Sequence, residues 1–314
     1  MNGFRNPFAK TSTRRFFDEG KQTEDYSLYD SFHGYLYAKW PYLYISVALG
    51  EHPLNKFLAP VFMFLFSIFE SEKEDQPQDP GYAWANSYHG KVVPLEEANN
   101  LVSVEEDIVI KDLEHVIPYS RAKDIILHNP QTIVALDCPC RLAREDHCTP
   151  VDVCLIVGDP FASFIMEHQP QKSRLITSGE AVDILRAEHE RGHVHHAFFK
   201  DAMLNRFYAI CNCCSCCCGA FQAQRNGTPM LITSGYTAAV DPALCEGCTT
   251  CSQYCHFSAI EMVEDLAVIH SDDCYGCGVC VDKCEQNAIT LNRDPAKGVP
   301  LEIHKLMEEA ALVN

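Results

Sequence analysis

Apolar side chains in the first eighty residues gather in patches that prolines interrupt. Residues 40–69 are rich in aromatic and aliphatic side chains, and residues 57–69 are apolar on all sides. This run falls short of the roughly 20 residues that a helix needs to span a bilayer. Pro41, Pro53 and Pro60 favour short, bent helices. The region is therefore predicted to be helical, either as buried core or as a segment that inserts at a membrane interface or docks on a membrane subunit.

Short apolar and β-branched runs predict strands in the middle of the chain. The five runs are residues 101–104, 107–110, 132–136, 151–157 and 207–211. Apolar residues at helical spacing predict a helix over residues 119–129, which Pro130 ends. The middle of the chain is thus expected to be a small α/β or α+β domain, and the fold class of the whole chain is predicted to be α+β.

Two further helices have clear sequence signals. Thr177 and Glu180 form a capping-box pattern, so a helix is expected to run from there to Arg191 and to end at Gly192. Residues 300–313 predict an amphipathic helix. Its apolar stripe consists of Ile303, Leu306, Met307 and Ala310.

Composition divides the chain into four parts. Residues 70–80 are polar, acidic and closed by prolines, which is typical of an exposed linker. The predicted parts are a helical, aromatic-rich apolar region with its acidic linker (1–80), a cysteine-rich α+β domain (81–236), a domain with two regular cysteine motifs (237–294) and a C-terminal helix (295–314).

The charge of the chain limits its partners. The net charge of -18 argues against nucleic acid, whose phosphates require a basic surface, and favours basic partner surfaces. Eighteen closely spaced cysteines indicate metal ligands in a reducing compartment. Residues 12–17 resemble a twin-arginine export signal but no apolar segment follows them, so we expect a cytoplasmic protein, peripheral to the inner face of the membrane if residues 35–69 dock there.

Eight of the cysteines form the pattern C-x2-C-x2-C-x3-C twice, at an offset of 29 residues. Three thiolates of one motif can bind one iron-sulfur cube, while the fourth lies too far along the chain and binds the other cube. The first cluster is therefore predicted to be bound by Cys245, Cys248, Cys251 and Cys284. The second is predicted to be bound by Cys274, Cys277, Cys280 and Cys255.

Residues 241–292 resemble the bacterial two-cluster ferredoxin domain. The repeat extends beyond the ligands, since residues 257–260 are echoed by residues 286–289. The resemblance implies a pseudo-twofold pair of hairpins and short helices around two [4Fe-4S] clusters. The proline that the family carries after each fourth cysteine is replaced by His256 and Glu285, so these side chains are expected to alter the cluster potentials. The C-terminal helix is expected to pack on this unit.

The other ten cysteines lie in the middle of the chain and predict at least one further metal centre, most simply another iron-sulfur cluster. The candidate ligands are Cys138, Cys140, Cys148, Cys211, Cys213, Cys214, Cys216, Cys217 and Cys218. Cys154 lies in an apolar run and is interpreted as a small buried hydrophobe. An extended segment would place Cys211, Cys213 and Cys217 on one face and Cys214, Cys216 and Cys218 on the other.

Two other uses of these thiols stay open. One is a structural zinc bound by Cys138, Cys140, Cys148 and a fourth ligand; the other is a redox-active disulfide or cysteine relay. His193 and His195 alternate on a segment expected to be extended and are candidates for hydrogen bonds to the sulfurs, metal binding or proton movement. Arg141 is expected either to stabilise thiolate charge or to pair with a nearby aspartate.

Two functional classes follow from these motifs. In the first, the protein passes single low-potential electrons between a redox donor and an acceptor, with residues 35–69 docking it to a membrane-associated redox complex. In the second, the middle cysteines build a catalytic cluster with an open iron, and the protein is a reductase. The carrier is preferred, because no acid–base constellation stands out beyond the histidines.

Overall fold

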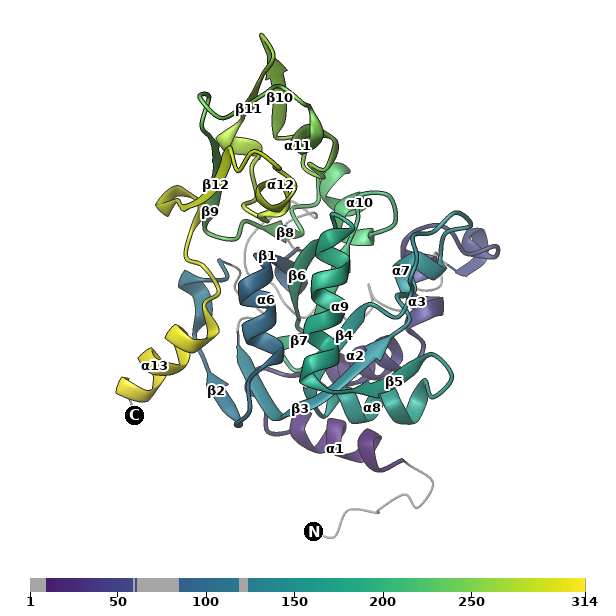
Figure 1. Ribbon diagram of the computed structural model, residues 1–314. Coiled ribbons are helices and arrows are strands. Elements are labelled where there is room, and N and C mark those ends of the chain that lie inside the picture. Colours follow the sequence, from purple (N-terminus) through teal and green to yellow (C-terminus); the bar gives the residue numbers. More distant parts are fainter. Residues whose placement is uncertain (1–9, 59, 61–84, 119–123, 314) are drawn as a thin grey trace.

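A sheet of eight strands forms the centre of the computed structural model, which describes residues 10–58, 60, 85–118 and 124–313 (Figure 1). The strand order is β2-β3-β4-β7-β6-β1-β8, and β5 pairs with β3 off this path. All pairs are antiparallel except β1 with β8. The strands are β1 (Tyr88–Val93), β2 (Ile108–Ile110), β3 (Ile125–Leu136), β4 (Cys154–Asp159), β5 (Ser173–Ile176), β6 (Val194–Lys200), β7 (Arg206–Cys213) and β8 (Leu231–Ile232).

Helices cover both faces of the sheet because its central strands are apolar on both sides. Along β3, Val134 joins one apolar core while Ile133 joins the other, and Ile156 and Leu155 of β4 divide in the same way. The first face is covered by α1 (Thr11–Gly20), α2 (Leu28–Lys39), α3 (Pro41–Ala48) and α8 (Phe161–His168). The second face is covered by α6 (Leu95–Val102), α9 (Ser178–Glu190) and α13 (Ile303–Val313).

Residues 236–293 form a smaller unit, the ferredoxin-like unit, at one end of the molecule (Figure 1). It has its own apolar core. Its elements are β9 (Tyr236–Val240), paired with β12 (Ile289–Arg293), β10 (Ile260–Val263), paired with β11 (Leu266–Ile269), α11 (Thr250–Gln253) and α12 (Val279–Asp282). Other short helices are α7 (Pro139–Leu142), α10 (Gly219–Arg225), η1 (Leu113–His115), η2 (Ser271–Asp273) and η3 (Pro295–Lys297).

Four of the five predicted strands are confirmed by β2, β3, β4 and β7. The strand predicted at 101–104 is wrong, because Leu101 and Val102 belong to α6 and, with Ala98, form its buried face. The helix predicted over 119–129 is also wrong from Ile125 onward, where β3 begins; residues 119–123 lie outside the described residues. Cross-strand pairing with β2 outweighs the helical spacing there.

The two later helix predictions have different outcomes. The capping box at Thr177 and Glu180 is present, and α9 follows it. The C-terminal helix forms as α13, but it packs on α6 and β2 and not on the ferredoxin-like unit. Its apolar stripe completes the core on the second face of the sheet, where Ile303 and Leu306 are buried.

The N-terminal segment packs on the first face through α1, α2 and α3. Tyr37 and Tyr44 are buried in its core, so these two aromatics are core residues. Nearly all of the apolar run at 57–69, and the linker at 70–80, lie outside the described residues. Within the ranges that are described, no helix is long and apolar enough to cross a membrane.

Candidate metal centres

The ferredoxin-like unit contains two cavities, each lined by four cysteines. One is lined by Cys245, Cys248, Cys251 and Cys284. The other is lined by Cys255, Cys274, Cys277 and Cys280. The fourth cysteine of each motif thus lies with the first three of the other, which is the grouping that the spacing predicts. Both cavities are lined by four soft thiolates, and this donor set fits a [4Fe-4S] cluster.

The backbone around the two cavities repeats as the sequence does. Gly247 and Gly276 occupy equivalent positions with φ of +68° and +66°. A Cβ atom at either position would lie about 2 Å from a carbonyl oxygen, 2.2 Å at the first and 2.1 Å at the second, so only glycine fits the tight turn between the ligands. The fourth thiols are equivalent as well, because the sulfurs of Cys255 and Cys284 each accept an N–H bond at 3.3 Å.

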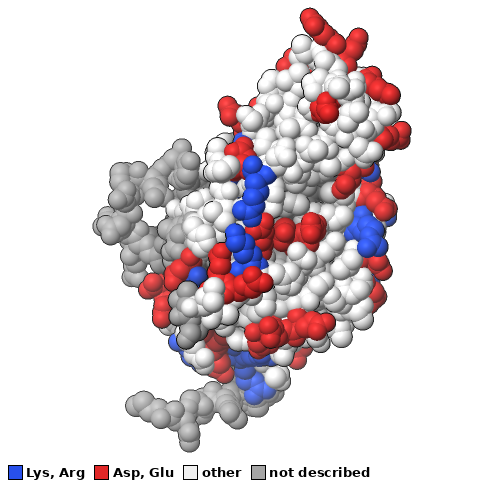
Figure 2. Space-filling model, turned by 60° about the vertical axis from the view of Figure 1, so that its left-hand side comes forward, with Lys and Arg blue, Asp and Glu red and all other residues white. Residues whose placement is uncertain are grey.

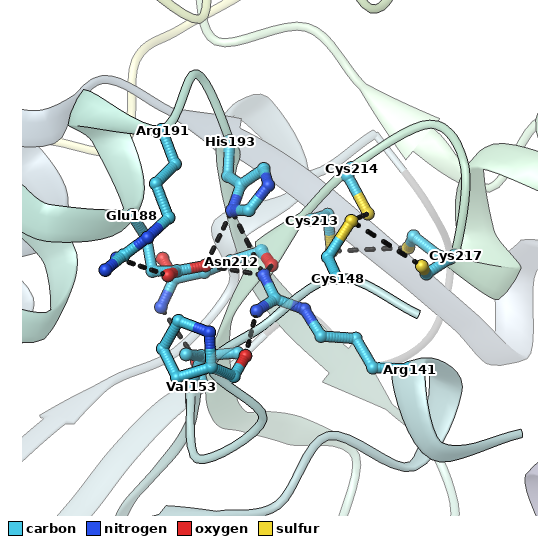
Figure 3. A network of polar contacts seen from close by, with 12 residues as sticks. Arg141, Cys148, Val153, Glu188, Arg191, His193, Asn212, Cys213, Cys214 and Cys217 are labelled. Atoms are coloured by element: carbon cyan, nitrogen blue, oxygen red, sulfur yellow. Dashed lines mark hydrogen bonds and ion pairs between the residues drawn. The ribbon is translucent and has the colours of Figure 1, made fainter. Parts of the chain in front are cut away.

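Four of the middle cysteines form a compact cluster, which we call the four-thiol site. It consists of Cys148, Cys214, Cys216 and Cys217, whose sulfurs all lie within 4.8 Å of one another. The Cys148 sulfur is 3.6 Å from that of Cys214, 3.3 Å from that of Cys216 and 3.8 Å from that of Cys217. The Cys216 sulfur lies 3.1 Å from that of Cys214 and 3.7 Å from that of Cys217. Figure 3 shows three of these thiols pointing toward one another across two loops.

The remaining six middle cysteines line a buried cavity on the first face of the sheet, which we call the thiol chamber. They are Cys138, Cys140, Cys154, Cys211, Cys213 and Cys218, and Cys214 and Cys217 of the four-thiol site line the same cavity. The thiol of Cys138 interacts with those of Cys140 and Cys154, and the thiol of Cys154 also interacts with that of Cys211. The sulfurs of Cys213 and Cys218 are 3.2 Å apart. Most of the other lining residues are aliphatic or aromatic.

Strand register explains why the thiol chamber forms. Cys154 and Cys211 stand directly opposite each other in the β4–β7 pair, so their side chains share one face. Cys138 follows β3 and Cys218 precedes α10, each as the N-cap residue of a short helix. Backbone N–H groups of the first turn of α10 point at the Cys218 sulfur. Contacts with the thiols of Cys140 and Cys154 lower the pKa of Cys138 although burial opposes this.

The structure divides the middle cysteines differently from the sequence-based alternation. The strand ends at Cys213, and the following turn sends Cys214 and Cys217 to one site, while Cys218 returns to Cys213. Cys214 and Cys216 do lie together and apart from Cys213, as the alternation predicts. The prediction is wrong for Cys217, which joins Cys214 and Cys216, and for Cys218, which joins Cys213. Cys154 is buried as expected, but it also lines the thiol chamber. The pairing of Cys154 with Cys211 across β4 and β7 indicates this role, and that pairing cannot be read from the sequence.

A buried ion pair lies beside the thiol chamber (Figure 3). The guanidinium of Arg141 contacts the Glu188 carboxylate, and both side chains are almost fully buried. Arg141 also donates to the carbonyl oxygen of Asn212 at 3.1 Å. It therefore pairs with Glu188, and not with a neighbouring aspartate. Burial alone would raise the pKa of Glu188, but hydrogen bonds from His193 and Arg141 outweigh it and hold that pKa below its usual value.

A chain of side chains joins the ferredoxin-like unit to the strand that carries the chamber cysteines. Asp282 accepts from Nε2 of His189 at 2.6 Å, and Nδ1 of His189 lies 3.2 Å from Nε2 of His195. Nδ1 of His195 in turn contacts Oδ1 of Asn212 at 2.6 Å. Asn212 stands between two chamber cysteines in β7. Burial, with a smaller effect of His189, lowers the pKa of His195 to about 3, so this ring is neutral.

The two histidines predicted from the sequence, His193 and His195, contact side chains next to the chamber cysteines and are not themselves among the residues that line the chamber. His193 contacts Glu188 at 2.6 Å and Arg141 at 3.1 Å, and His195 contacts Asn212. Both therefore belong to the group of hydrogen-bonded side chains next to β7. Their binding of a metal, or of its sulfur ligands, stays a prediction. His189 belongs to the same group and is missing from the sequence-based candidates, because its contact with His195 depends on the turn at Gly192.

Aromatic rings fill the space between the thiol chamber and the second ferredoxin cavity. Phe221 of α10 packs on Phe257 with ring centroids 5.0 Å apart. Phe257 stacks on Tyr275 at 4.2 Å and 8°, and both line the cavity of Cys274. The core on the first face of the sheet thus continues into the ferredoxin-like unit. The cavity with Cys255 is consequently the one that adjoins the middle domain.

Comparison with known proteins gives one family match and no curated relative. Residues 267–290 match the family described as a 4Fe-4S binding domain. No curated protein matches the chain. The matched segment contains Cys274, Cys277, Cys280 and Cys284. The chain therefore carries an iron-sulfur, ferredoxin-like domain in its C-terminal part and binds at least one [4Fe-4S] cluster.

Proposed function

We propose that the protein is an electron-transfer protein that passes single low-potential electrons between two redox partners through three iron-sulfur clusters. Two clusters are bound in the ferredoxin-like unit by the two sets of four cysteines predicted from the spacing. The third is bound in the thiol chamber. When bound, these clusters supply one-electron oxidation and reduction.

One observation carries this proposal: the second ferredoxin cavity and the thiol chamber are joined by a continuous apolar core. Phe221, Phe257 and Tyr275 pack against one another along this core. Thiolates are the preferred ligands of iron-sulfur clusters, and the chamber is lined by eight thiols, six of them outside the four-thiol site. The order of the three sites along the molecule is then the outer ferredoxin cavity, the inner ferredoxin cavity and the chamber.

The surface of the ferredoxin-like unit suits a basic redox partner. Residues 241–292 contain nine acidic residues and one basic residue, Lys283. Figure 2 shows acidic side chains projecting from the end of the molecule that carries β10 and β11. A basic docking surface on the donor or acceptor would be attracted to this end, so transfer is expected to slow as salt is raised. The docking of residues 35–69 to a membrane-associated redox complex stays a proposal, and it would use the exposed side chains of Trp40, Leu43, Leu54 and Phe57 because Tyr37 and Tyr44 are buried.

A second candidate, the reductase, is favoured by the arrangement of the chamber thiols. The thiols of Cys140, Cys138, Cys154 and Cys211 interact in a row, and the sulfurs of Cys213 and Cys218 lie 3.2 Å apart. Two sulfurs this close cannot bind separate irons of one cube, so Cys213 and Cys218 supply at most one ligand between them without rearrangement. A cube bound by only three thiolates would have one open iron. The hydroxyls of Tyr37, Tyr88 and Tyr208, which hydrogen-bond to one another, line the same cavity.

Iron and acid-labile sulfide analysis of the anaerobically purified protein tests the proposal. About twelve irons per chain are expected, four for each of three clusters, whereas about eight would confine the clusters to the ferredoxin-like unit. The double variant Cys213→Ser/Cys218→Ser, which removes both sulfurs of the pair at 3.2 Å, should lose about four irons and keep the ferredoxin EPR signals. Cyanide, as a small iron ligand, separates the two candidates: it should leave the EPR spectrum of a carrier unchanged and shift that of a cluster with an open iron.

A further inference from the structure

The sulfur spacings of the four-thiol site fit one metal ion. Four thiolates bound at about 2.3 Å to a tetrahedral ion lie about 3.8 Å from one another. The four ligands of an iron-sulfur cube lie roughly 6 Å apart, because they are attached outside its four irons. Five of the six separations at this site run from 3.1 to 3.8 Å, and the sixth is no more than 4.8 Å. All four sulfurs are thus mutually at the separation that a single ion requires, whereas the thiol chamber has a close pair, Cys213 and Cys218, within a larger set of thiols.

The same molecule provides an internal comparison. Each set of four ferredoxin cysteines surrounds a cavity. Within the described part of the chain, the four-thiol site is the one group whose ligand atoms all lie within 4.8 Å of one another. The molecule thus contains cysteine groups that are spread around a cavity, as a cluster requires, and one group whose sulfurs are close enough for a single ion. The four-thiol site is the group suited to a single ion.

The ligand set and its exposure favour zinc over iron. Four cysteine thiolates in a closed tetrahedron are typical of structural zinc sites. Zinc also binds such a site more tightly than ferrous iron does. Cys216 is exposed, and zinc, which has no redox chemistry, is not oxidised by contact with oxygen.

We infer that Cys148, Cys214, Cys216 and Cys217 bind one zinc ion as a structural site, separate from the three clusters of the proposed function. The ion ties the loop before β4 to the turn after β7. Ser215 lies within that turn, and its hydroxyl contacts Nδ1 of His256 in the ferredoxin-like unit at 3.0 Å. The zinc site therefore fixes the surface on which the inner half of the ferredoxin-like unit rests.

Metal analysis of two matched variants tests this inference. Cys216→Ser and Cys248→Ser each remove one exposed cysteine, the first from the four-thiol site and the second from the outer ferredoxin cavity. Zinc and iron are measured per chain in both variants and in the unaltered protein, after anaerobic purification from iron-replete medium. Cys148→Ser serves as a second variant of the site if the first folds poorly.

We expect each variant to lose a different metal. The unaltered protein and Cys248→Ser should contain one zinc per chain, Cys216→Ser should contain none, and only Cys248→Ser should lose iron. Zinc-edge X-ray absorption should give four sulfur neighbours at about 2.3 Å. An unaltered protein without zinc, one iron in place of zinc, or loss of iron in Cys216→Ser would each overturn the inference. Zinc that disappears with Cys248→Ser would also overturn it. Because the zinc count does not depend on the iron count, failure of the three-cluster proposal would be seen separately.

Discussion

His256 hydrogen-bonds to the middle domain with both ring nitrogens: Nδ1 lies 3.0 Å from the hydroxyl of Ser215, and Nε2 lies 2.9 Å from the carbonyl oxygen of Gly192. It follows Cys255, where the ferredoxin family carries proline. The departure from the family pattern is thus a contact between the two units. A proline at this position has no side-chain hydrogen bond to offer.

We predict that His256→Pro weakens this contact. Loss of two hydrogen bonds should cost about 1–2 kcal/mol of stability and shift the potential of the cluster bound by Cys255. Anaerobic thermal unfolding and an EPR-monitored redox titration measure both effects. Glu285→Pro is the matched control at the equivalent position of the repeat. Equal effects of the two substitutions would show that the proline itself, and not the lost contact, is responsible.

Gly192→Ala should also disturb the junction between the two units. Gly192 has φ of +86°, and a Cβ atom there would lie 2.4 Å from the Tyr254 ring. Gly227 follows the end of α10 with the same pattern of backbone hydrogen bonds, a similar φ of +89° and nothing within 4 Å of its Cβ position. Gly227→Ala therefore measures the backbone cost alone, about 1 kcal/mol. Gly192→Ala should cost clearly more in thermal unfolding; equal losses for the two variants would argue against close packing of Tyr254.

The two ferredoxin cavities predict which cluster each fourth cysteine supports. Cys284→Ser should remove the cluster of Cys245, and Cys255→Ser should remove the cluster of Cys274. Each variant should lose about four irons. Because the second cavity adjoins the middle domain, Cys255→Ser should slow reduction of the proposed chamber cluster more than Cys284→Ser does, measured by rapid-freeze EPR. Loss of the cluster within the variant's own motif would contradict this pairing of ligands.

Glu188→Gln should strongly destabilise the middle domain. It leaves the Arg141 guanidinium buried without an opposite charge, at a cost of about 3 kcal/mol. The double variant Arg141→Met/Glu188→Leu removes both charges and should recover much of the loss. Chemical unfolding of the single and double variants gives the coupling between the two residues. Additive effects on the free energy of unfolding would indicate that the interaction between Arg141 and Glu188 does not contribute to stability.

Acid should destabilise the fold through its buried histidines. Burial is the main cause that lowers the pKa of His196 to about 3, and the ring packs against Phe198 and Phe221. Between pH 3 and about 6.5 the unfolded state binds a proton at this site that the folded state does not. Stability is therefore full above about pH 6.5 and falls on acidification, by up to about 1.4 kcal/mol per pH unit for one such group.

The comparison of the unaltered protein with His196→Phe isolates this effect, because acid lability of the clusters is common to both. The phenylalanine variant should lose less stability between pH 7 and pH 5 in chemical unfolding. Parallel pH profiles for the two proteins would exclude His196 as a contributor.

The sequence was most informative where chemistry depends on spacing along the chain. The repeat of Cys245 to Cys255 in Cys274 to Cys284 sets the grouping seen around the two cavities, because both motifs are local loops of fixed length. The capping box before α9 is local in the same sense. Such features need no knowledge of the remaining fold.

Predictions failed where distant segments decide. Ile125 is in a strand because it pairs with β2. Helix α13 packs on the second face of the sheet because burial of its apolar side chains there completes the core. The partition of the middle cysteines depends on a turn after Cys213 and on the loop that carries Cys148. The alternation of residues along a strand predicts neither this turn nor the position of the loop with Cys148 beside it.

The register of β4 and β7 places Cys154 directly across from Cys211. Successive side chains of a strand point to opposite faces, so inserting or deleting a single residue in either strand would carry one thiol through the sheet to the α9 side. Side chains around the chamber can change in size while the sulfurs stay where they are, but the length of these strands cannot change. In related chains, gaps in an alignment should therefore be absent from these two strands even where their residues differ.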